Sequence, residues 1–320
     1  MSVFDALGVR LFAGVSALRS KGLTVLIYHR VHRQHDSFTS GDVDAVTFSW
    51  HLNVLKKHFN VVRLREAIQG LSDGEALPRN AIAITFDDGY RDNAEVALPL
   101  LEAAGLPATF FIATGFLDGG IMWNDRIIES LKRTRLSSLP LDDFGLDNAV
   151  LSTETQRADT AGRLINALKH KPFAERDEMV EALVSRCDVE LPRDLMMDAA
   201  QLPQFVEAGM EIGAHTVNHP ILTRIGEDVA LKEIQDSRNF LEDLLNVRVA
   251  GFAYPNGRPE EDYDASHVEI VQQLGFDYAM STRWGIASSE DNRHALPRIN
   301  PWDTTPSRWT ARIALAKWGR

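Results

Sequence analysis

Cysteine is almost absent from this sequence, because Cys187 is the only one among 320 residues. A single cysteine excludes an internal disulfide and leaves no thiolate cluster for a metal ion. Any metal bound by this chain must therefore be held by nitrogen and oxygen ligands. The low cysteine content also suits a reducing cytoplasm, which is the compartment we expect.

An excess of positive charge is missing as well. The chain has 34 basic and 45 acidic residues, which gives a formal net charge of -11. Such a chain supplies no positive field to attract a phosphate backbone. We therefore expect no nucleic acid partner.

The sequence also lacks a hydrophobic run long enough to span a membrane. Residues 11–18 are uncharged and largely apolar, but a bilayer span needs roughly 20 such residues. Asp5, Arg10 and Arg19 flank this run, which also argues against a signal peptide. We expect no transmembrane segment.

The same N-terminal region is typical of an amphipathic helix over residues 1–20. Its large apolar residues recur at helical spacing, namely Phe4, Leu7, Leu11, Val15 and Leu18. A helix docked on the body of the protein is the favoured interpretation. A peripheral contact of this helix with a membrane surface stays open, which would make a cytoplasmic enzyme membrane-associated.

Short apolar runs alternate with helical patterns along most of the chain, which indicates an α/β fold, either a barrel or an open sheet. Strands are predicted at 24–28, 81–86, 108–113, 211–214, 249–254 and 278–281. Helices are predicted at 49–59, 93–104, 202–208, 227–245 and 267–274. Both fold types concentrate their chemistry at the carboxyl ends of the strands.

One stretch interrupts this alternation. Residues 122–198 contain three charged helical segments and no predicted strand, so we interpret them as a helical insertion that overhangs the active face of the fold. The rest of the fold then comprises residues 21–121 and 199–304, followed by a helix at 305–320. Trp302, Trp309 and Trp318 in this last part are expected to pack onto the body of the protein.

Two adjacent carboxylates, Asp87 and Asp88, stand directly after a predicted strand in the sequence Thr-Phe-Asp-Asp-Gly. Neighbouring like charges repel unless a cation or hydrogen bonds offset them. If a metal binds one of the two, the other is free to act as a base on water. Alternatively, one of them simply caps the helix that begins near Asn93.

Two histidines, His215 and His219, follow another predicted strand. Imidazoles four residues apart can converge on one ion if the chain turns once between them. Because both the aspartate pair and the histidine pair follow strands, they meet at one edge of an α/β fold. A carboxylate and two imidazoles with open coordination positions are typical of a catalytic metal site.

With these motifs the sequence resembles the polysaccharide deacetylases, the NodB homology family of carbohydrate esterase family 4. The resemblance covers roughly residues 23–120 and 202–301 and implies a distorted (β/α)7 barrel of the NodB type. It also implies that Asp87 is the general base and that Asp88, His215 and His219 bind one divalent metal ion, usually Zn²⁺.

The segment Phe-Ala-Tyr-Pro-Asn-Gly at 252–257 resembles a further motif of the family. The resemblance implies that the backbone N–H of Asn256 helps to form an oxyanion hole. Many relatives have an arginine where this chain has Ala253, so we expect its task, such as fixing the base, to fall to Arg298. Pro255 and Arg298 are expected at the substrate site.

The general acid is less directly indicated. The early His29, in the sequence Leu-Ile-Tyr-His-Arg, resembles the permuted branch of the family that includes the exopolysaccharide deacetylases, and there the early histidine is the acid. We therefore assign the acid to His29, with His294 as the alternative. Aromatic residues near the motifs could stack on sugar rings, namely Tyr28, Tyr90, Trp123, Tyr254 and Trp284, and Tyr28, Trp123 and Tyr254 are taken as substrate contacts.

Together these features predict a hydrolase of carbon–nitrogen bonds that removes the acetyl group of an N-acetylated sugar in a glycan. Two alternatives remain at this point. One is an amidase that acts on a small amide without sugar, and the other is a carbohydrate-binding protein without metal or catalysis.

Overall fold

The fold is described from a computed structural model that covers residues 3–18, 22–39, 41–300 and 302–318. The outer ends of the predicted terminal helices, at 1–2, 19–20 and 319–320, lie outside this part of the chain. So does residue 21, where the barrel was predicted to begin.

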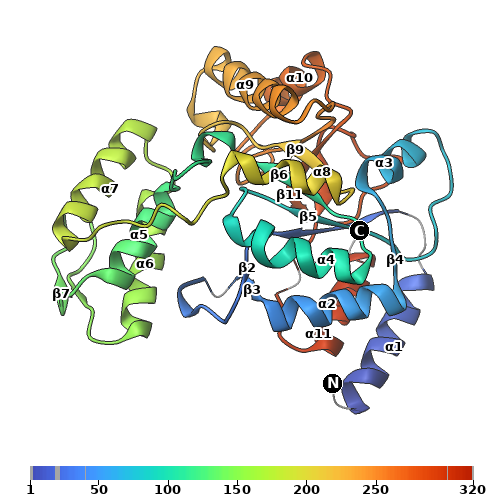
Figure 1. The fold of residues 1–320 in the computed structure, drawn as a ribbon, viewed down its shortest axis with the longest axis horizontal. Helices are drawn as coiled ribbons and strands as arrows, with labels where there is room; N and C mark the ends of the chain where they lie inside the picture. Colours follow the sequence, from blue (N-terminus) through green and yellow to red (C-terminus); the bar gives the residue numbers. More distant parts are fainter. Residues whose placement is uncertain (1–2, 19–21, 40, 301, 319–320) are drawn as a thin grey trace.

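A nearly closed barrel of seven parallel strands forms the centre of the molecule (Figure 1). Around the barrel the strands are β1 (Thr24–Tyr28), β5 (Ala81–Phe86), β6 (Thr109–Ile112), β9 (Glu211–Ala214), β10 (Gly251–Ala253), β11 (Tyr278–Trp284) and β12 (Leu296–Arg298). The chain just after β12 returns to β1, where Ile27 N–H donates to Ile299 O at 3.0 Å and Ile299 N–H donates to Val25 O at 2.8 Å. The predicted distorted (β/α)7 barrel is confirmed.

The strands are apolar because both of their faces are covered. Every residue of β1 and β5 is buried, as expected for parallel strands with side chains inside the barrel and helices outside it. The sequence did not predict β12, since Pro297 lies in its middle and cannot donate to a sheet.

Helices surround the barrel on its outer side (Figure 1). They are α2 (Ala45–His58), α3 (Leu64–Ser72), α4 (Leu98–Ala104), α8 (Pro203–Glu207), α9 (Glu227–Leu245) and α10 (Ala265–Gln273). A π-helical turn, η2 (Asn93–Ala97), leads into α4. The short elements of the barrel region are β2 (Val31–His32), η1 (Ser37–Thr39), β3 (Val43–Asp44), β4 (Asn60–Val61), η3 (Thr114–Phe116), η5 (Ala199–Gln201) and η6 (Leu222–Arg224).

The insertion forms a lobe beside the barrel, at the left of Figure 1. It contains α5 (Trp123–Arg133), β7 (Ser138–Leu139), η4 (Asp142–Phe144), β8 (Ala149–Val150), α6 (Glu154–Leu168) and α7 (Phe173–Cys187). Its helices enclose a hydrophobic core of their own. The expectation of no strand here is wrong, because β7 and β8 pair in antiparallel fashion. Two-residue strands are too short to show an alternating pattern in the sequence.

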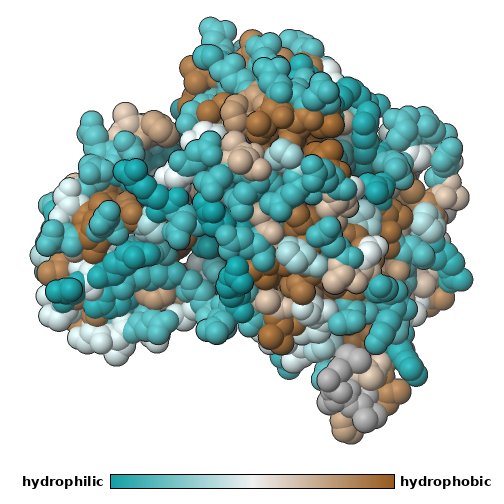
Figure 2. Space-filling view, in the orientation of Figure 1, coloured by the Kyte–Doolittle hydropathy of each residue, from teal (hydrophilic) through white to brown (hydrophobic). Residues whose placement is uncertain are grey.

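The terminal helices α1 (Val3–Leu18) and α11 (Pro306–Ala316) pack against each other beside α2. Val9 and Trp309 are buried at this end of the molecule, whereas Phe4, Leu7 and Leu11 on α1 are 86%, 59% and 62% exposed. In Figure 2 hydrophobic side chains of this region reach the surface at the bottom of the view. No helix among the described residues is long and apolar enough to cross a membrane.

The three C-terminal tryptophans do not share one environment. Trp309 is fully buried, so its predicted packing is confirmed. Trp302 and Trp318 are covered only in part, at 60% and 47% exposed, and the Trp302 ring lies 5.7 Å from that of Trp284 on β11. A tryptophan on a turn or at a helix end can face solvent even when its sequence context is helical, because only the fold decides which side is covered.

Candidate active site

The residues predicted as catalytic or metal-binding meet in one pocket at the carboxyl ends of the barrel strands. Asp87 and Asp88 follow β5, His215 follows β9, and His29 follows β1. These residues line a cavity of about 360 Å³ together with His219 and Asn256. The lobe covers one side of this cavity through Trp123, Asn124, Asp125 and Ile128 of α5, and through Ile165 and Lys169 at the end of α6.

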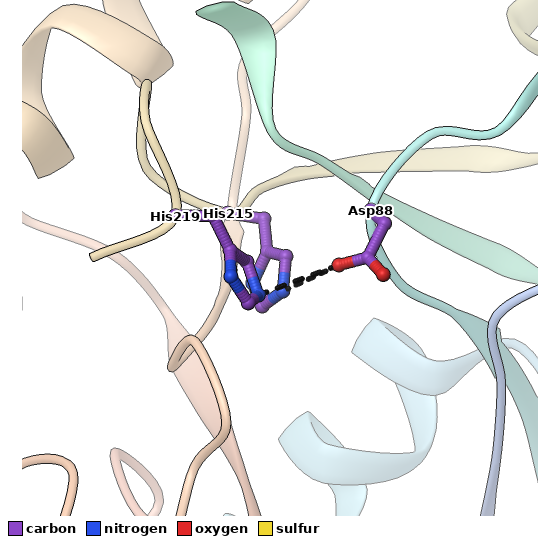
Figure 3. Close-up of side chains that lie close together, drawn as sticks. All are labelled: Asp88, His215 and His219. Atoms are coloured by element: carbon purple, nitrogen blue, oxygen red, sulfur yellow. Dashed lines mark ion pairs between the residues drawn. The ribbon is translucent and has the colours of Figure 1, made fainter. Parts of the chain in front are cut away.

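Asp88, His215 and His219 converge on one point (Figure 3). Asp88 Oδ1 lies 3.4 Å from His215 Nε2 and 3.4 Å from His219 Nε2. Metal–ligand bonds of about 2.1 Å at tetrahedral angles would separate two ligand atoms by about 3.4 Å. The three side chains are therefore spaced as the ligands of a small cation would be.

The orientation of His215 supports the same interpretation. Its Nδ1 lies 2.7 Å from Ala253 O, and because a carbonyl can only accept, Nδ1 carries the proton. Nε2 of the neutral ring then presents a lone pair toward Asp88 Oδ1, a buried oxygen without a hydrogen-bond partner among the described residues. Acceptor atoms that face each other in a buried site are costly unless a cation lies between them. The residues thus fit a divalent metal ion.

Strained backbone holds these ligands in place. Asp88, Thr216 and His219 have positive φ angles of 78°, 63° and 51°, which residues other than glycine rarely adopt. The loop between the two histidines is anchored by Glu233, whose Oε2 accepts from the N–H groups of Val217 at 2.9 Å and Asn218 at 2.8 Å. Such strain persists only where the surroundings over-determine the conformation, as they do at functional sites.

The two histidines differ in charge state. Burial lowers the pKa of His219 to about 4, so its ring is neutral at neutral pH, as a metal ligand must be. Burial also opposes protonation of His215, but its pKa is raised because Asp88 and Asp87 lie beside it. A cation among the ligands would compete with that proton.

Asp87 is held by Arg298 and does not belong to the cluster of Asp88, His215 and His219. The Arg298 guanidinium donates to both carboxylate oxygens of Asp87 at 2.7 Å each and to Ser281 O at 3.0 Å. Both side chains are buried, with exposed fractions of 3% or less. Burial opposes the ionisation of Asp87, yet the charge of Arg298 outweighs it and lowers the pKa of this carboxyl. Asp87 is therefore an ionised, rigidly placed carboxylate beside Asp88.

The structure separates the two histidines considered for the acid. His29 lines the pocket, and its backbone carbonyl accepts from Asn93 Nδ2 of the π-helical turn at 2.8 Å. His294 precedes β12 at the opposite end of the barrel, where its Nε2 lies 3.0 Å from Phe276 O. His294 does not line the pocket.

The predicted substrate contacts fall into different environments. Trp123 lines the pocket, although the Arg176 guanidinium lies over its ring at 4.6 Å. Tyr28 lines an adjoining cavity and is otherwise buried, with its hydroxyl 3.0 Å from His51 Nδ1. Arg298 is fully buried behind Asp87, where it pairs with that carboxylate and does not line the pocket.

A substrate contact is not supported for Tyr254 or Pro255. Tyr254 is fully buried, donates to His294 O at 2.8 Å and stacks on Tyr263 with ring centroids 3.8 Å apart. Pro255 is buried as well. The chain leaves the extended conformation after β10, where Asn256 has a positive φ of 59°, and Asn256 lines the pocket while Tyr254 and Pro255 stay in the core.

Sequence reasoning missed a polar cluster next to the ligands. Tyr90 donates to Asp125 Oδ2 at 3.0 Å, and the Arg30 guanidinium lies 4.6 Å above the Tyr90 ring. Arg30 in turn donates to Asp92 at 2.8 Å. The cluster links α5 to the loop that carries Asp88. No local signal could reveal it, because a charged residue in a helical segment usually faces solvent.

Asp125 should make stability depend on pH. Burial raises its pKa to about 7, above the usual value of 3.8. Between these values the folded protein keeps a proton that the unfolded chain releases, so this contribution to stability is present at low pH and is lost as the pH rises toward 7. Asparagine does not titrate, so Asp125→Asn should not lose this contribution. As the pH rises from 5 to 8, the unfolding free energy of wild type is expected to fall by about 3 kcal/mol relative to that of Asp125→Asn.

Urea unfolding at both pH values in the presence of a chelator measures this difference. Asp142→Asn, at an exposed position of the lobe, is the control and should follow wild type. Parallel stability curves for wild type and Asp125→Asn would contradict the expectation.

Comparison with known proteins agrees with the fold and shows the family. A model of the polysaccharide deacetylase family matches residues 74–137 and 167–279, which is more than half of the chain. The chain therefore belongs to the polysaccharide deacetylase family. Its members are hydrolases that cleave the carbon–nitrogen bond of N-acetyl groups.

Individual relatives are distant but cover most of the chain. YxkH of Bacillus subtilis (strain 168), whose name assigns it to the polysaccharide deacetylases, is 20% identical over 278 residues, which are 87% of this chain and 70% of YxkH. The solved structure of the Streptococcus pyogenes deacetylase PplD in complex with acetate superposes with a TM-score of 0.59 and 22% identity, over 90% of this chain and 96% of PplD. IcaB from Ammonifex degensii superposes with a TM-score of 0.60 and 19% identity, over 93% and 97%. At such identities the two structures bear on the fold alone.

Proposed function

We propose that this chain is a metal-dependent N-deacetylase that releases acetate from an N-acetylated amino sugar within a glycan. The observation that carries this proposal is the pairing of two features in one pocket. Three ligand atoms converge beside Asp87, a buried carboxylate that Arg298 keeps ionised. Metal-assisted hydrolysis of an amide requires a metal site and a base beside it, and this pocket offers both.

Asp88, His215 and His219 would hold the metal, and one carboxylate with two imidazoles favours Zn²⁺. Such an ion supplies Lewis-acid activation of the substrate amide and of the attacking water. The open side of the cluster faces the cavity that His29 and Asn256 also line, which leaves room for the amide.

Three residues of the chain would act on the reacting atoms. Asp87 accepts the proton of the attacking water. The backbone N–H of Asn256 donates to the oxyanion that develops on the carbonyl oxygen, and losing one such donor typically costs about 3 kcal/mol of barrier. His29 donates a proton to the departing nitrogen, because an amide nitrogen leaves poorly as an anion.

Acetate release tests the proposal directly. The substrates are N-acetylglucosamine oligomers and lipid-linked glycan precursors, assayed before and after removal of metal by a chelator and again after addition of Zn²⁺. We expect release that the chelator abolishes and Zn²⁺ restores. Release from small amides alone would favour the amidase alternative, and full activity after chelation would contradict metal dependence.

The acid role of His29 can be separated from a structural one. His29→Gln is expected to lower kcat/KM for acetate release by about 100-fold without loss of bound metal, since glutamine cannot act as an acid toward the leaving amine. His294→Gln is the matched control. It should cost about 1 kcal/mol of stability through the lost hydrogen bond to Phe276 O and leave kcat/KM for acetate release unchanged.

A peripheral membrane contact through α1 is also proposed. The exposed residues Phe4, Leu7, Leu11 and Leu18 form one row along the helix, and Leu315 of α11 is 67% exposed on the neighbouring helix. Leu7→Glu with Leu11→Glu is expected to weaken binding to phosphatidylcholine vesicles at least tenfold in flotation assays. Val150→Glu, at an exposed site of the lobe, should bind as wild type does. Equal flotation of all three proteins would rule out the contact.

A further inference from the structure

Two exposed tryptophans lie together at the rim of the barrel. Trp284 is 44% exposed and Trp302 is 60% exposed, and their ring centroids are 5.7 Å apart at an interplanar angle of 57°. Burial of an indole ring contributes a large favourable free energy, which these two exposed rings do not gain. Exposed aromatic surface of this kind commonly marks a binding site.

Trp284 is the last residue of β11, one of the strands beside the catalytic pocket. The Cα atom of Trp284 pairs with that of Arg298, the residue that holds Asp87. Thr282, two residues before Trp284, lines the catalytic pocket. The register between β11 and β12 shifts between Met280 and Trp284, and Trp284 lies beyond Thr282 at the exposed end of β11.

Trp302 lies near the catalytic pocket because it lines a neighbouring cavity. It lines a smaller cavity together with His29, Arg30 and Asp42, and these three residues also line the catalytic pocket. The two cavities thus share a wall at His29, the proposed acid. Trp302 therefore lies one wall away from the catalytic pocket, on the side of His29.

Trp302 is braced although it is exposed. The Arg312 guanidinium of α11 lies 3.9 Å from the centroid of its ring. Asp303 accepts from Arg312 NH2 at 2.9 Å and so fixes the guanidinium in turn. A ring held before binding loses little conformational freedom when a ligand packs on it.

We propose that Trp302 and Trp284 form an outer sugar subsite, which binds a unit of the glycan next to the one whose acetyl group is removed. The inference rests on the proposed function and makes it more specific, because such an enzyme requires an oligomer rather than a single sugar. The apolar C–H face of a pyranose ring packs well against indole, and the sugar hydroxyls stay in water at the rim. A small amide in the catalytic pocket would not reach these rings.

Binding without turnover tests the subsite. Asp87→Asn serves as the parent protein, and calorimetry measures its dissociation constants for β-1,4-linked and β-1,6-linked N-acetylglucosamine oligomers of one to six units. We expect affinity to rise with chain length for one of the two linkages. Adding Trp302→Ala should weaken binding of the hexamer about tenfold and leave binding of the monomer unchanged, whereas Trp302→Phe should retain most of the affinity.

Trp318→Ala is the matched control, because Trp318 is 47% exposed and does not line either cavity. Trp284→Ala provides a second variant should Trp302→Ala unfold, which circular dichroism would detect. A hexamer that the parent fails to bind, or that the tryptophan variants bind as tightly as the parent, overturns the subsite. Failure of wild type to release acetate from any oligomer would instead overturn the proposed function. The dissociation constants of the parent and the tryptophan variants would still test the subsite, because they do not depend on activity.

Discussion

Replacing Asp87 with asparagine is expected to lower kcat/KM for acetate release by about 10²-fold to 10⁴-fold. Asparagine has nearly the same shape but cannot accept the proton of the attacking water. Because Arg298 lowers the pKa of Asp87, the wild-type base is ionised throughout the neutral range. The loss should therefore be independent of pH between 6 and 8. Steady-state assays of acetate release over this range measure it.

The control must separate the lost base from damage to the site. Asp87→Asn leaves the buried Arg298 without its anion, which can cost several kcal/mol of stability. The double variant Asp87→Asn with Arg298→Met removes that uncompensated charge and should recover stability without recovering activity. If activity returned together with stability, Asp87 would be a structural residue and not the base.

Replacing His215 with glutamine is expected to remove bound metal and to lower kcat/KM by about 10³-fold or more. His215 is oriented by Ala253 O, so its Nε2 contributes both a donor atom and a fixed direction to the cluster. Metal content per chain after purification, measured by mass spectrometry, should fall from close to one to near zero.

His267→Gln is the matched control for this experiment. His267 is also buried, but it belongs to the capping box of α10 with Asp264 and lies outside the pocket. The control should keep its metal and most of its activity. Undiminished metal content in His215→Gln would show that the ion is bound elsewhere.

The alternation of strands and helices could be predicted because both sides of a parallel strand are buried. The run from Ala81 to Phe86 is apolar for that reason, and it was placed correctly. The same rule missed β12, which consists of three residues with Pro297 among them. A strand that closes a barrel is defined by its neighbours, here Val25 and Ile27 of β1, and not by a pattern of its own.

The choice of donor atoms could also be predicted before the fold was known. Asp88, His215 and His219 follow strands, and parallel strands end at one edge, so their proximity follows from local patterns. The environment of the aromatic residues could not be predicted in this way. Tyr254 and Trp302 are both large and amphipathic, yet one is fully buried and the other is 60% exposed.

The sequence by itself determined which groups are available: a carboxylate and two imidazoles that follow strands, a second carboxylate beside them, and an α/β fold that brings strand ends together. Only the tertiary structure decided which distant groups meet. Arg298 reaches Asp87 across 211 positions of the chain, because β12 lies beside β1 and closes the barrel. The same closure places His29 in the pocket and leaves His294 at the opposite end of the barrel. Local patterns record which residues prefer burial, but a partner far along the chain is selected by strand order and register.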